Sequence, residues 1–192
     1  MRGRLGRRLA LSGLAGMLAV TGALPGMTGV ALAAVADVVT GIDTTLWNPD
    51  APGLSGVAFR SPDRLIVVDM QNHDFAGFDG TNLWEYSLTT GQVAYTGSIL
   101  PDDQDDPTGV AYDAATDTLF VSSDSTMSVY VIKPGIDGKF GTADEGNGNG
   151  DPIAVLPSTG DVEDPAFNPV NKHLYVLAGG GVITDFDPGL DL

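Results

Sequence analysis

The chain has 192 residues, with 25 acidic and nine basic side chains and a formal net charge of −16 at pH 7. A surface of this sign repels nucleic acid and anionic membranes, so it argues against partners of those classes and suits an extracellular protein or one that collects divalent cations. The sequence contains no cysteine, which excludes disulfides and lipid anchors on cysteine.

Residues 1–36 have the pattern of a secretory signal peptide. Four arginines within the first eight residues precede an apolar stretch at 9–24, and small-residue cleavage motifs follow at 31–33 and 34–36. A retained membrane anchor is the alternative, but several glycines and Pro25 interrupt the apolar run. We therefore expect a secreted or periplasmic protein without membrane insertion after cleavage, exported by either the general or the twin-arginine route.

Residues 37–192 contain all the acidic residues and five of the basic ones, and we expect them to form one domain. The segment Val38–Leu46 alternates weakly between apolar and polar residues. We interpret it as an isolated outer strand.

The first repeat unit follows this segment. Its four predicted strands are Gly56–Phe59, Arg64–Asp69, Leu83–Leu88 and Gln92–Ile99. Thr89-Thr90-Gly91 forms the tight turn between the last two, and a long turn at 71–82 joins the second and third.

The second and third units repeat this pattern. The strands of the second are Gly109–Tyr112, Thr118–Ser122, Ser128–Ile132 and Pro152–Leu156, with a long turn at 134–151. Those of the third are Pro165–Phe167, His173–Leu177 and Gly181–Phe186, with no fourth strand before the sequence stops.

The spacing of the units predicts the fold. Phe59, Tyr112 and Phe167 are equivalent positions, 53 and 55 residues apart. Short apolar runs at such a period, separated by turn residues, are typical of β-propeller blades. We predict an all-β fold, a partial β-propeller of about three four-stranded antiparallel blades. Closed propellers have four to eight blades, so either the chain is a piece of a longer propeller or two copies form a homodimer by strand exchange.

The three units together resemble the six-bladed propeller superfamily that contains NHL-repeat, SMP-30/gluconolactonase-like and SdiA-regulated proteins. The stretches at 106–113 and 117–124 carry the resemblance, in which a Pro-x-Gly turn leads into an inner strand and Leu-Phe-Val-Ser-Ser forms the next. The resemblance implies a six-bladed architecture. It does not imply one activity, since such folds carry hydrolases, oxidoreductases, scaffolds and binding modules.

The lactonase branch of that superfamily implies a metal in the central channel, held by acidic and Asn side chains. The equivalent loops here offer Ser55, Thr108 and the pair Glu163-Asp164, so one loop of three carries carboxylates. A metal-dependent hydrolase, lactonase- or phosphoesterase-like, would require Asp50, Asp106 and Glu163 or Asp164 to converge.

A second resemblance is local. The segment 135–145, GIDGKFGTADE, resembles the DGxFGTxDD calcium loops of bacterial extracellular proteins. Ca²⁺ takes six to eight oxygen ligands from carboxylates and backbone carbonyls on a flexible turn. The predicted metal ligands are Asp137, Lys139, Thr142, Asp144 and Glu145, where Lys139 and Thr142 contribute carbonyl oxygens. Phe140 is the expected apolar anchor of the loop. The alternative is a flexible Gly-Asn-rich hairpin tip with solvated acids.

The other candidates are weaker. His73, Asp74 and Asp79 in the long turn could join a second metal site, whereas His173 at a strand start fits a packed side chain better than a ligand. Trp47, Trp84, Tyr86, Tyr95 and Tyr130 fit packing between blades. No Gly-x-Ser-x-Gly motif is present, and no nucleophile can be named.

The sequence therefore favours a secreted, acidic, calcium-binding propeller module with a binding or structural role, whose partner is an unidentified extracellular protein or small ligand. The alternative is the secreted metal-dependent hydrolase. An enzyme is the less favoured of the two readings.

Cleavage of the signal peptide predicts a mature N-terminus near Ala34 or Asp37, because the small-residue motifs end there. Mass spectrometry of the protein purified from its native host measures this directly. Recovery of a chain that retains Met1 to Ala33 would contradict the prediction.

Overall fold

The computed structural model describes residues 41–70, 80–99, 106–142, 153–158, 160–187 and 189. The expected signal peptide at 1–36 lies outside these residues. None of the helices in the described part of the chain has the length and hydropathy of a membrane span.

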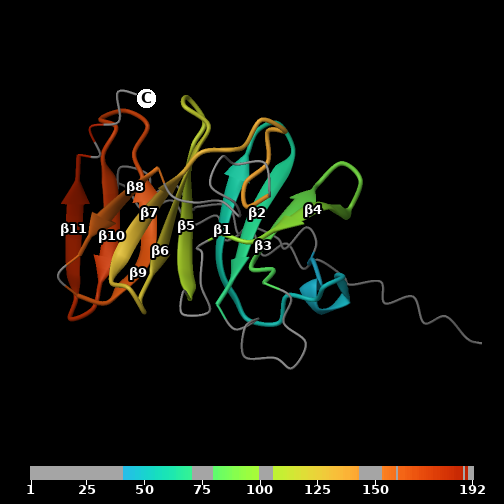
Figure 1. The fold of residues 1–192 in the computed structure, drawn as a ribbon, viewed down its shortest axis with the longest axis horizontal. Helices are drawn as coiled ribbons and strands as arrows, with labels where there is room; N and C mark the ends of the chain where they lie inside the picture. Colours follow the sequence, from blue (N-terminus) through green and yellow to red (C-terminus); the bar gives the residue numbers. More distant parts are fainter. Residues whose placement is uncertain are drawn as a thin grey trace, which may run out of the picture. The chain divides into compact units, whose positions relative to one another are not determined.

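The described residues from 42 onward form one structural unit of eleven strands in three antiparallel sheets, which we call blades 1, 2 and 3 (Figure 1). Blade 1 comprises β1 (Leu54–Arg60), β2 (Arg64–Asp69), β3 (Leu83–Ser87) and β4 (Gln92–Gly97). Blade 2 comprises β5 (Pro107–Asp113), β6 (Thr118–Ser123), β7 (Ser128–Ile132) and β8 (Ala154–Pro157). Blade 3 comprises β9 (Val162–Phe167), β10 (Leu174–Ala178) and β11 (Val182–Phe186).

The all-β fold class is confirmed, and so is the division into units of four, four and three strands. Within each sheet the strands pair in chain order, as the repeat predicts. The strands at Arg64–Asp69 and Ser128–Ile132 have the predicted bounds, whereas the inner strands β1, β5 and β9 begin two or three residues earlier than predicted.

The predicted outer strand at Val38–Leu46 is wrong in the part that the structure describes. Thr44–Leu46 forms a short 3-10 turn, η1. The Asp43 carboxylate accepts hydrogen bonds from the backbone N–H of Thr45 at 3.2 Å and from its hydroxyl at 2.6 Å. Short polar side chains that bond the local backbone in this way favour a turn over strand pairing.

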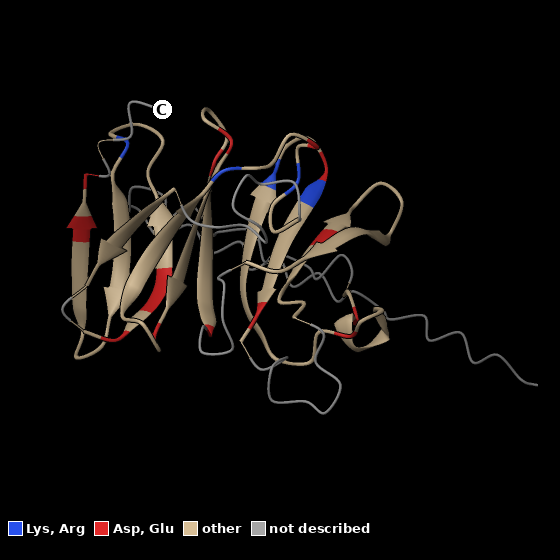
Figure 2. Ribbon diagram, in the orientation of Figure 1, with Lys and Arg blue, Asp and Glu red and all other residues tan. Residues whose placement is uncertain are grey.

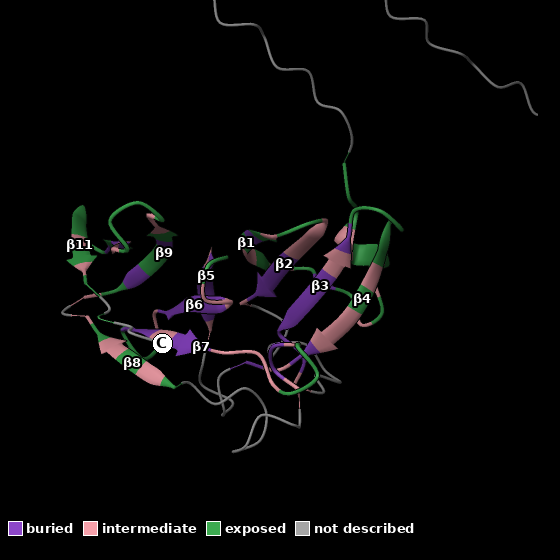
Figure 3. Ribbon diagram, turned by 90° about the horizontal axis from the view of Figure 1, so that it is seen from above, coloured by how far each residue is buried: buried purple, intermediate pink, exposed green. Residues whose placement is uncertain are grey.

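Blade 2 is buried on both faces, because alternate side chains of its strands point to opposite sides of the sheet. One face packs against blade 1 in a cluster centred on Val110, Leu119 and Val121. The other packs against blade 3 in a cluster that includes Phe120 and Val176. Figure 3 shows the buried positions concentrated on β2, β3, β6 and β7.

The inner strands β1, β5 and β9 are neighbours, and their contacts depend on two glycines. A Cβ atom on Gly56 would lie 2.8 Å from the backbone nitrogen of Val110, and one on Gly109 would lie 2.8 Å from Cα of Asp164. Only residues without a side chain permit this approach.

Hydroxyl groups one residue earlier join the same strands. The Ser55 hydroxyl of β1 donates a hydrogen bond to the carbonyl of Pro107 in β5. The Thr108 hydroxyl of β5 donates to the carbonyl of Val162 in β9 at 2.8 Å. The same side-chain-to-backbone bond therefore recurs at both blade junctions.

We expect Gly56→Ala to destabilise the fold, because its new Cβ would meet only backbone atoms, at 2.8–3.0 Å. Overpacking of this kind costs ~1–3 kcal/mol. Urea denaturation followed by circular dichroism measures the change in the free energy of unfolding.

Gly160→Ala is the matched control, since a Cβ there has no atom within 4 Å. It should change the free energy of unfolding by less than about 0.5 kcal/mol. Equal effects of the two substitutions would show that the inner strands tolerate wider spacing.

Candidate functional site

The segment 133–142 leaves β7 of blade 2 and docks on blade 1. Phe140 is fully buried in the cluster between the two blades, which confirms its predicted role as the anchor of the loop. Its backbone N–H donates to the Tyr95 hydroxyl at 3.0 Å, and the Gly141 carbonyl accepts from the Ser98 N–H at 2.8 Å. The loop is thus attached to β4 and to the residue that follows it.

Arg60, the last residue of β1, bonds this loop to both blades. Its guanidinium donates to Glu85 and to Asp117, each at 2.9 Å, and to the carbonyl of Gly138 at 2.9 Å. It also lies 4.9 Å from the centre of the Phe140 ring. A rigid guanidinium with five N–H donors suits such a multiple contact.

Tyr112 completes this cluster from β5. Its hydroxyl donates to Asp117 at 2.7 Å, and its ring meets Phe140 edge-on. Burial, reinforced by the hydrogen bond to Asp117, raises the pKa of Tyr112 to about 12. The phenol therefore stays protonated and donates throughout the ordinary pH range.

The sequence-based prediction missed Arg60 as a connecting residue. A signal was present in the repeat itself, because the equivalent residues of the other two units are Asp113 and Asn168. A basic side chain at a position that is otherwise acidic or neutral indicates a contact specific to one blade.

Asp137 is exposed near the tip of the loop, and three of the five predicted calcium ligands meet there. The Asp137 carboxylate accepts from the backbone N–H of Lys139 at 2.9 Å and from the Thr142 hydroxyl at 3.4 Å. The Lys139 ammonium lies 3.0 Å from the second carboxylate oxygen. Partial desolvation raises the pKa of Asp137, but these Lys139 contacts outweigh it and hold the pKa below its ordinary value.

The other predicted ligands, Asp144 and Glu145, lie outside the described residues. The carbonyls of Gly138 and Lys139 accept hydrogen bonds from Arg60 and from the Gly135 N–H. Of the predicted ligands in the described part of the chain, Asp137 alone carries a carboxylate. The ammonium of Lys139 already neutralises it, so a metal ion would have to replace that ammonium.

The residues considered for a channel metal do not form a cluster. Within the described part of the chain, no three His, Cys, Asp or Glu side chains lie close enough to hold a metal ion together. Ser55 and Thr108 use their hydroxyls to join neighbouring strands, as described above. Glu163 and Asp164 lie within β9 and are exposed, rather than in a turn before it.

Of the two histidines, His173 is described and half-buried. Its Nδ1 lies 2.7 Å from Asp185 of β11, and its ring stacks with Tyr175. His73, Asp74 and Asp79 lie outside the described residues.

Comparisons with known proteins bear on the fold. No family model matches the sequence. Mechanosensory abnormality protein 6 of Caenorhabditis elegans is 34% identical over 94 residues, which cover 46% of this chain and 24% of that protein. A solved structure of hydrazine synthase from Kuenenia stuttgartiensis superposes with a TM-score of 0.51 at 15% identity, covering 84% of this chain and 37% of that chain.

The fold is propeller-like. The hydrazine synthase contains a propeller, and its likeness to the three sheets here concerns the fold alone. The chain spans 24% of the curated relative and 37% of the solved structure, less than two thirds of either length.

We expect Phe140→Ala to lower the free energy of unfolding by ~3–5 kcal/mol, the range for removing a buried aromatic ring. Ile136→Ala, in the same loop but 97% exposed, is the control and should change it little. Thermal unfolding of both variants measures the difference. A Phe140→Ala protein as stable as the wild type would contradict the docking of the loop on blade 1.

Proposed function

We propose that this chain is a secreted, acidic, calcium-binding β-propeller module of the NHL, SMP-30-like or SdiA-regulated-like group, with a binding or structural role. The observation that carries the proposal is the geometry of the 135–142 loop. Phe140 fixes one side of the loop in the core, while the Asp137 carboxylate stays exposed three residues away.

The local chemistry supports calcium at this loop. Asp137 already bonds the backbone of Lys139 and the hydroxyl of Thr142, which holds an ionised carboxylate in a turn. Asp144 and Glu145 follow Thr142 within three residues and add two carboxylates to the same segment. When bound, calcium would supply charge neutralisation and cross-linking of the turn, which is a structural contribution.

The position of the loop explains how calcium would matter to the module. The loop belongs to blade 2 in sequence and contacts Arg60, Tyr95 and Ser98 of blade 1. A cation that orders the loop would therefore stabilise the junction between the two blades. In this role calcium would act by stabilising the folded module, and the role requires no catalytic residue.

We expect roughly 10 mM calcium, well above the dissociation constants of ~0.1–1 mM found in extracellular modules, to raise the thermal midpoint by a few degrees. A ligand that binds only the folded state stabilises it by mass action. Asp144→Ala should abolish this increment and leave the midpoint without calcium nearly unchanged. Asp137→Asn should reduce the increment as well.

Two further variants sharpen the test. Lys139→Met removes the ammonium that competes for Asp137 and should increase the calcium response, whereas Asp187→Ala, an exposed acid outside the loop, should not alter it. Differential scanning calorimetry with calcium or magnesium measures each midpoint. An equal calcium response in wild type and Asp144→Ala would refute the assignment.

A further inference from the structure

A hollow of about 420 Å³ lies on the face of blade 1 that points away from blade 2. Its wall is largely apolar and includes Ile42, Trp47, Val57, Leu65 and Val67. The volume falls within the ~300–1,000 Å³ typical of small-molecule sites.

The alternation of side chains along β1 and β2 determines which residues form this face. Ala58 and Ile66 pair across β1 and β2 and point into the core shared with blade 2. Val57 and Val67, the adjacent pair, therefore point to the other side. Val57 remains 62% exposed there.

The segment before β1 covers only the outer half of this face. Trp47 stacks on Tyr86 with ring centres 5.4 Å apart, and the Trp84 indole N–H donates to the carbonyl of Pro49 at 3.0 Å. These contacts hold Trp47 at one end of the hollow as an aromatic wall. The inner half, around β1, stays accessible.

Asp164 is the one charged residue that lines the hollow, although it comes from β9 of blade 3. Its carboxylate reaches this place because Gly109 of β5 has no side chain. A Cβ on Gly109 would lie 2.7 Å from Oδ1 of Asp164. Within the described residues, no hydrogen bond or ion pair involves this carboxylate, and partial burial raises its pKa above the ordinary value.

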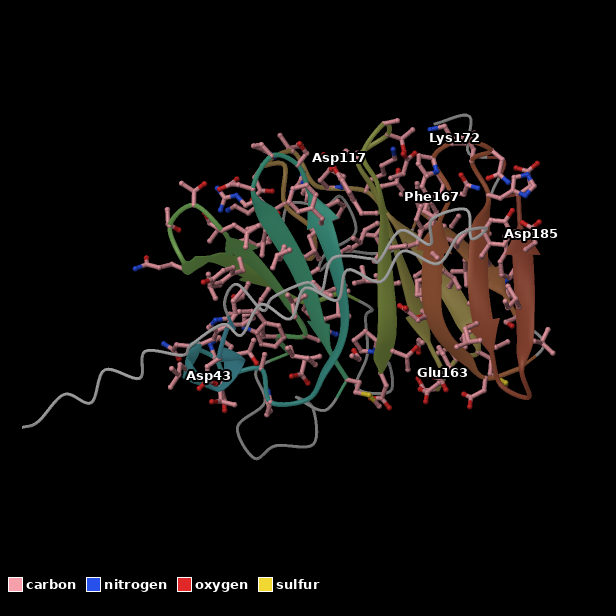
Figure 4. The ribbon with its side chains drawn as sticks, turned by 180° about the vertical axis from the view of Figure 1, so that it is seen from behind. Asp43, Asp117, Glu163, Phe167, Lys172 and Asp185 are labelled. Atoms are coloured by element: carbon pink, nitrogen blue, oxygen red, sulfur yellow. The ribbon has the colours of Figure 1, made fainter. Side chains whose placement is uncertain are left out.

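The surrounding charge favours a cation. All five basic residues of the described chain lie at the end of the strands where β1 turns into β2, the upper edge in Figure 2. The part of β1 that lines the hollow, Leu54 to Val57, lies toward the opposite end, where β1 begins. Figure 4 shows Asp43 and Glu163 at this end and Asp117 and Lys172 at the other. Charges of one sign around a low-dielectric cleft raise the local concentration of oppositely charged ligands.

We propose that the hollow binds an organic ammonium ion, a cation that carries an apolar group. The ammonium pairs with the Asp164 carboxylate, and the apolar group packs against Trp47 and Val57. An anionic ligand would meet the unneutralised Asp164, and a purely apolar one would leave that carboxylate without a partner. The proposal does not rest on the calcium loop, because none of residues 135–142 lines the hollow.

Benzylammonium chloride is a suitable probe, with benzyl alcohol as its neutral counterpart of nearly equal shape. Isothermal titration calorimetry on the mature chain should show benzylammonium binding at least roughly tenfold more tightly, the preference expected from one charge-assisted hydrogen bond. Quenching of tryptophan fluorescence by either compound reports on Trp47 and Trp84, the only tryptophans present.

Asp164→Asn should remove the preference for benzylammonium while binding of benzyl alcohol persists. Glu163→Gln, the neighbouring exposed acid that does not line the hollow, should leave the preference intact. Asp144→Ala should leave it intact too, which separates this site from the calcium loop.

Three results would overturn the proposal. One is equal affinity for the two compounds in the wild type, which would indicate an apolar surface without charge recognition. Another is equal loss in the Asp164→Asn and Glu163→Gln variants, which would indicate attraction by net charge alone. The third is a chain that is a dimer by light scattering and binds neither compound. A second copy seated on blade 1 would then occupy the face.

Discussion

The close approach of the inner strands is the constraint on which the rest of this structure depends. Gly56 and Gly109 let each strand lie against the next, and the hydroxyls of Ser55 and Thr108 bond across the same two junctions. With the inner strands fixed, the period of two along each strand directs alternate side chains into one interblade core or the other. The third unit has Asp164 where the first two have glycine, and this single difference places a carboxylate beside the open face of blade 1.

The two ends of the strands differ in their chemistry. At the end that carries the β1–β2 turn, acids are paired with bases, as in the contacts of Arg60 with Glu85 and Asp117 and of Lys139 with Asp137. Arg60 also donates to the Gly138 carbonyl, and this hydrogen bond holds the long loop of blade 2 on blade 1. At the other end, the described residues include acids such as Asp43 and Glu163 but no lysine or arginine. In the described part of the chain, the basic side chains are therefore gathered at the end with the β1–β2 turn, and the opposite end keeps a net negative charge.

Sequence reasoning predicted the repeat, the sheets and the anchoring role of Phe140, because these follow from local periodicity and from one apolar residue in a polar loop. It failed at Thr44–Leu46, where the Asp43 side chain bonds the backbone and overrides a weak alternation. It also missed Arg60 and the hollow that Asp164 lines. Both join residues more than fifty positions apart. The repeat marks Arg60 as unusual at its position, but it does not show which distant residues Arg60 contacts.

Phe140 gives the chain an order of assembly. By sequence it follows β7, but its ring completes the core between blades 1 and 2, and the four strands of blade 1 all leave the ribosome earlier. Blade 1 therefore stays incompletely packed until most of blade 2 has been synthesised. A blade buries its apolar faces only against its neighbours. A nascent chain that stops before residue 140 would therefore leave exposed the apolar side chains of blade 1 that Phe140 covers.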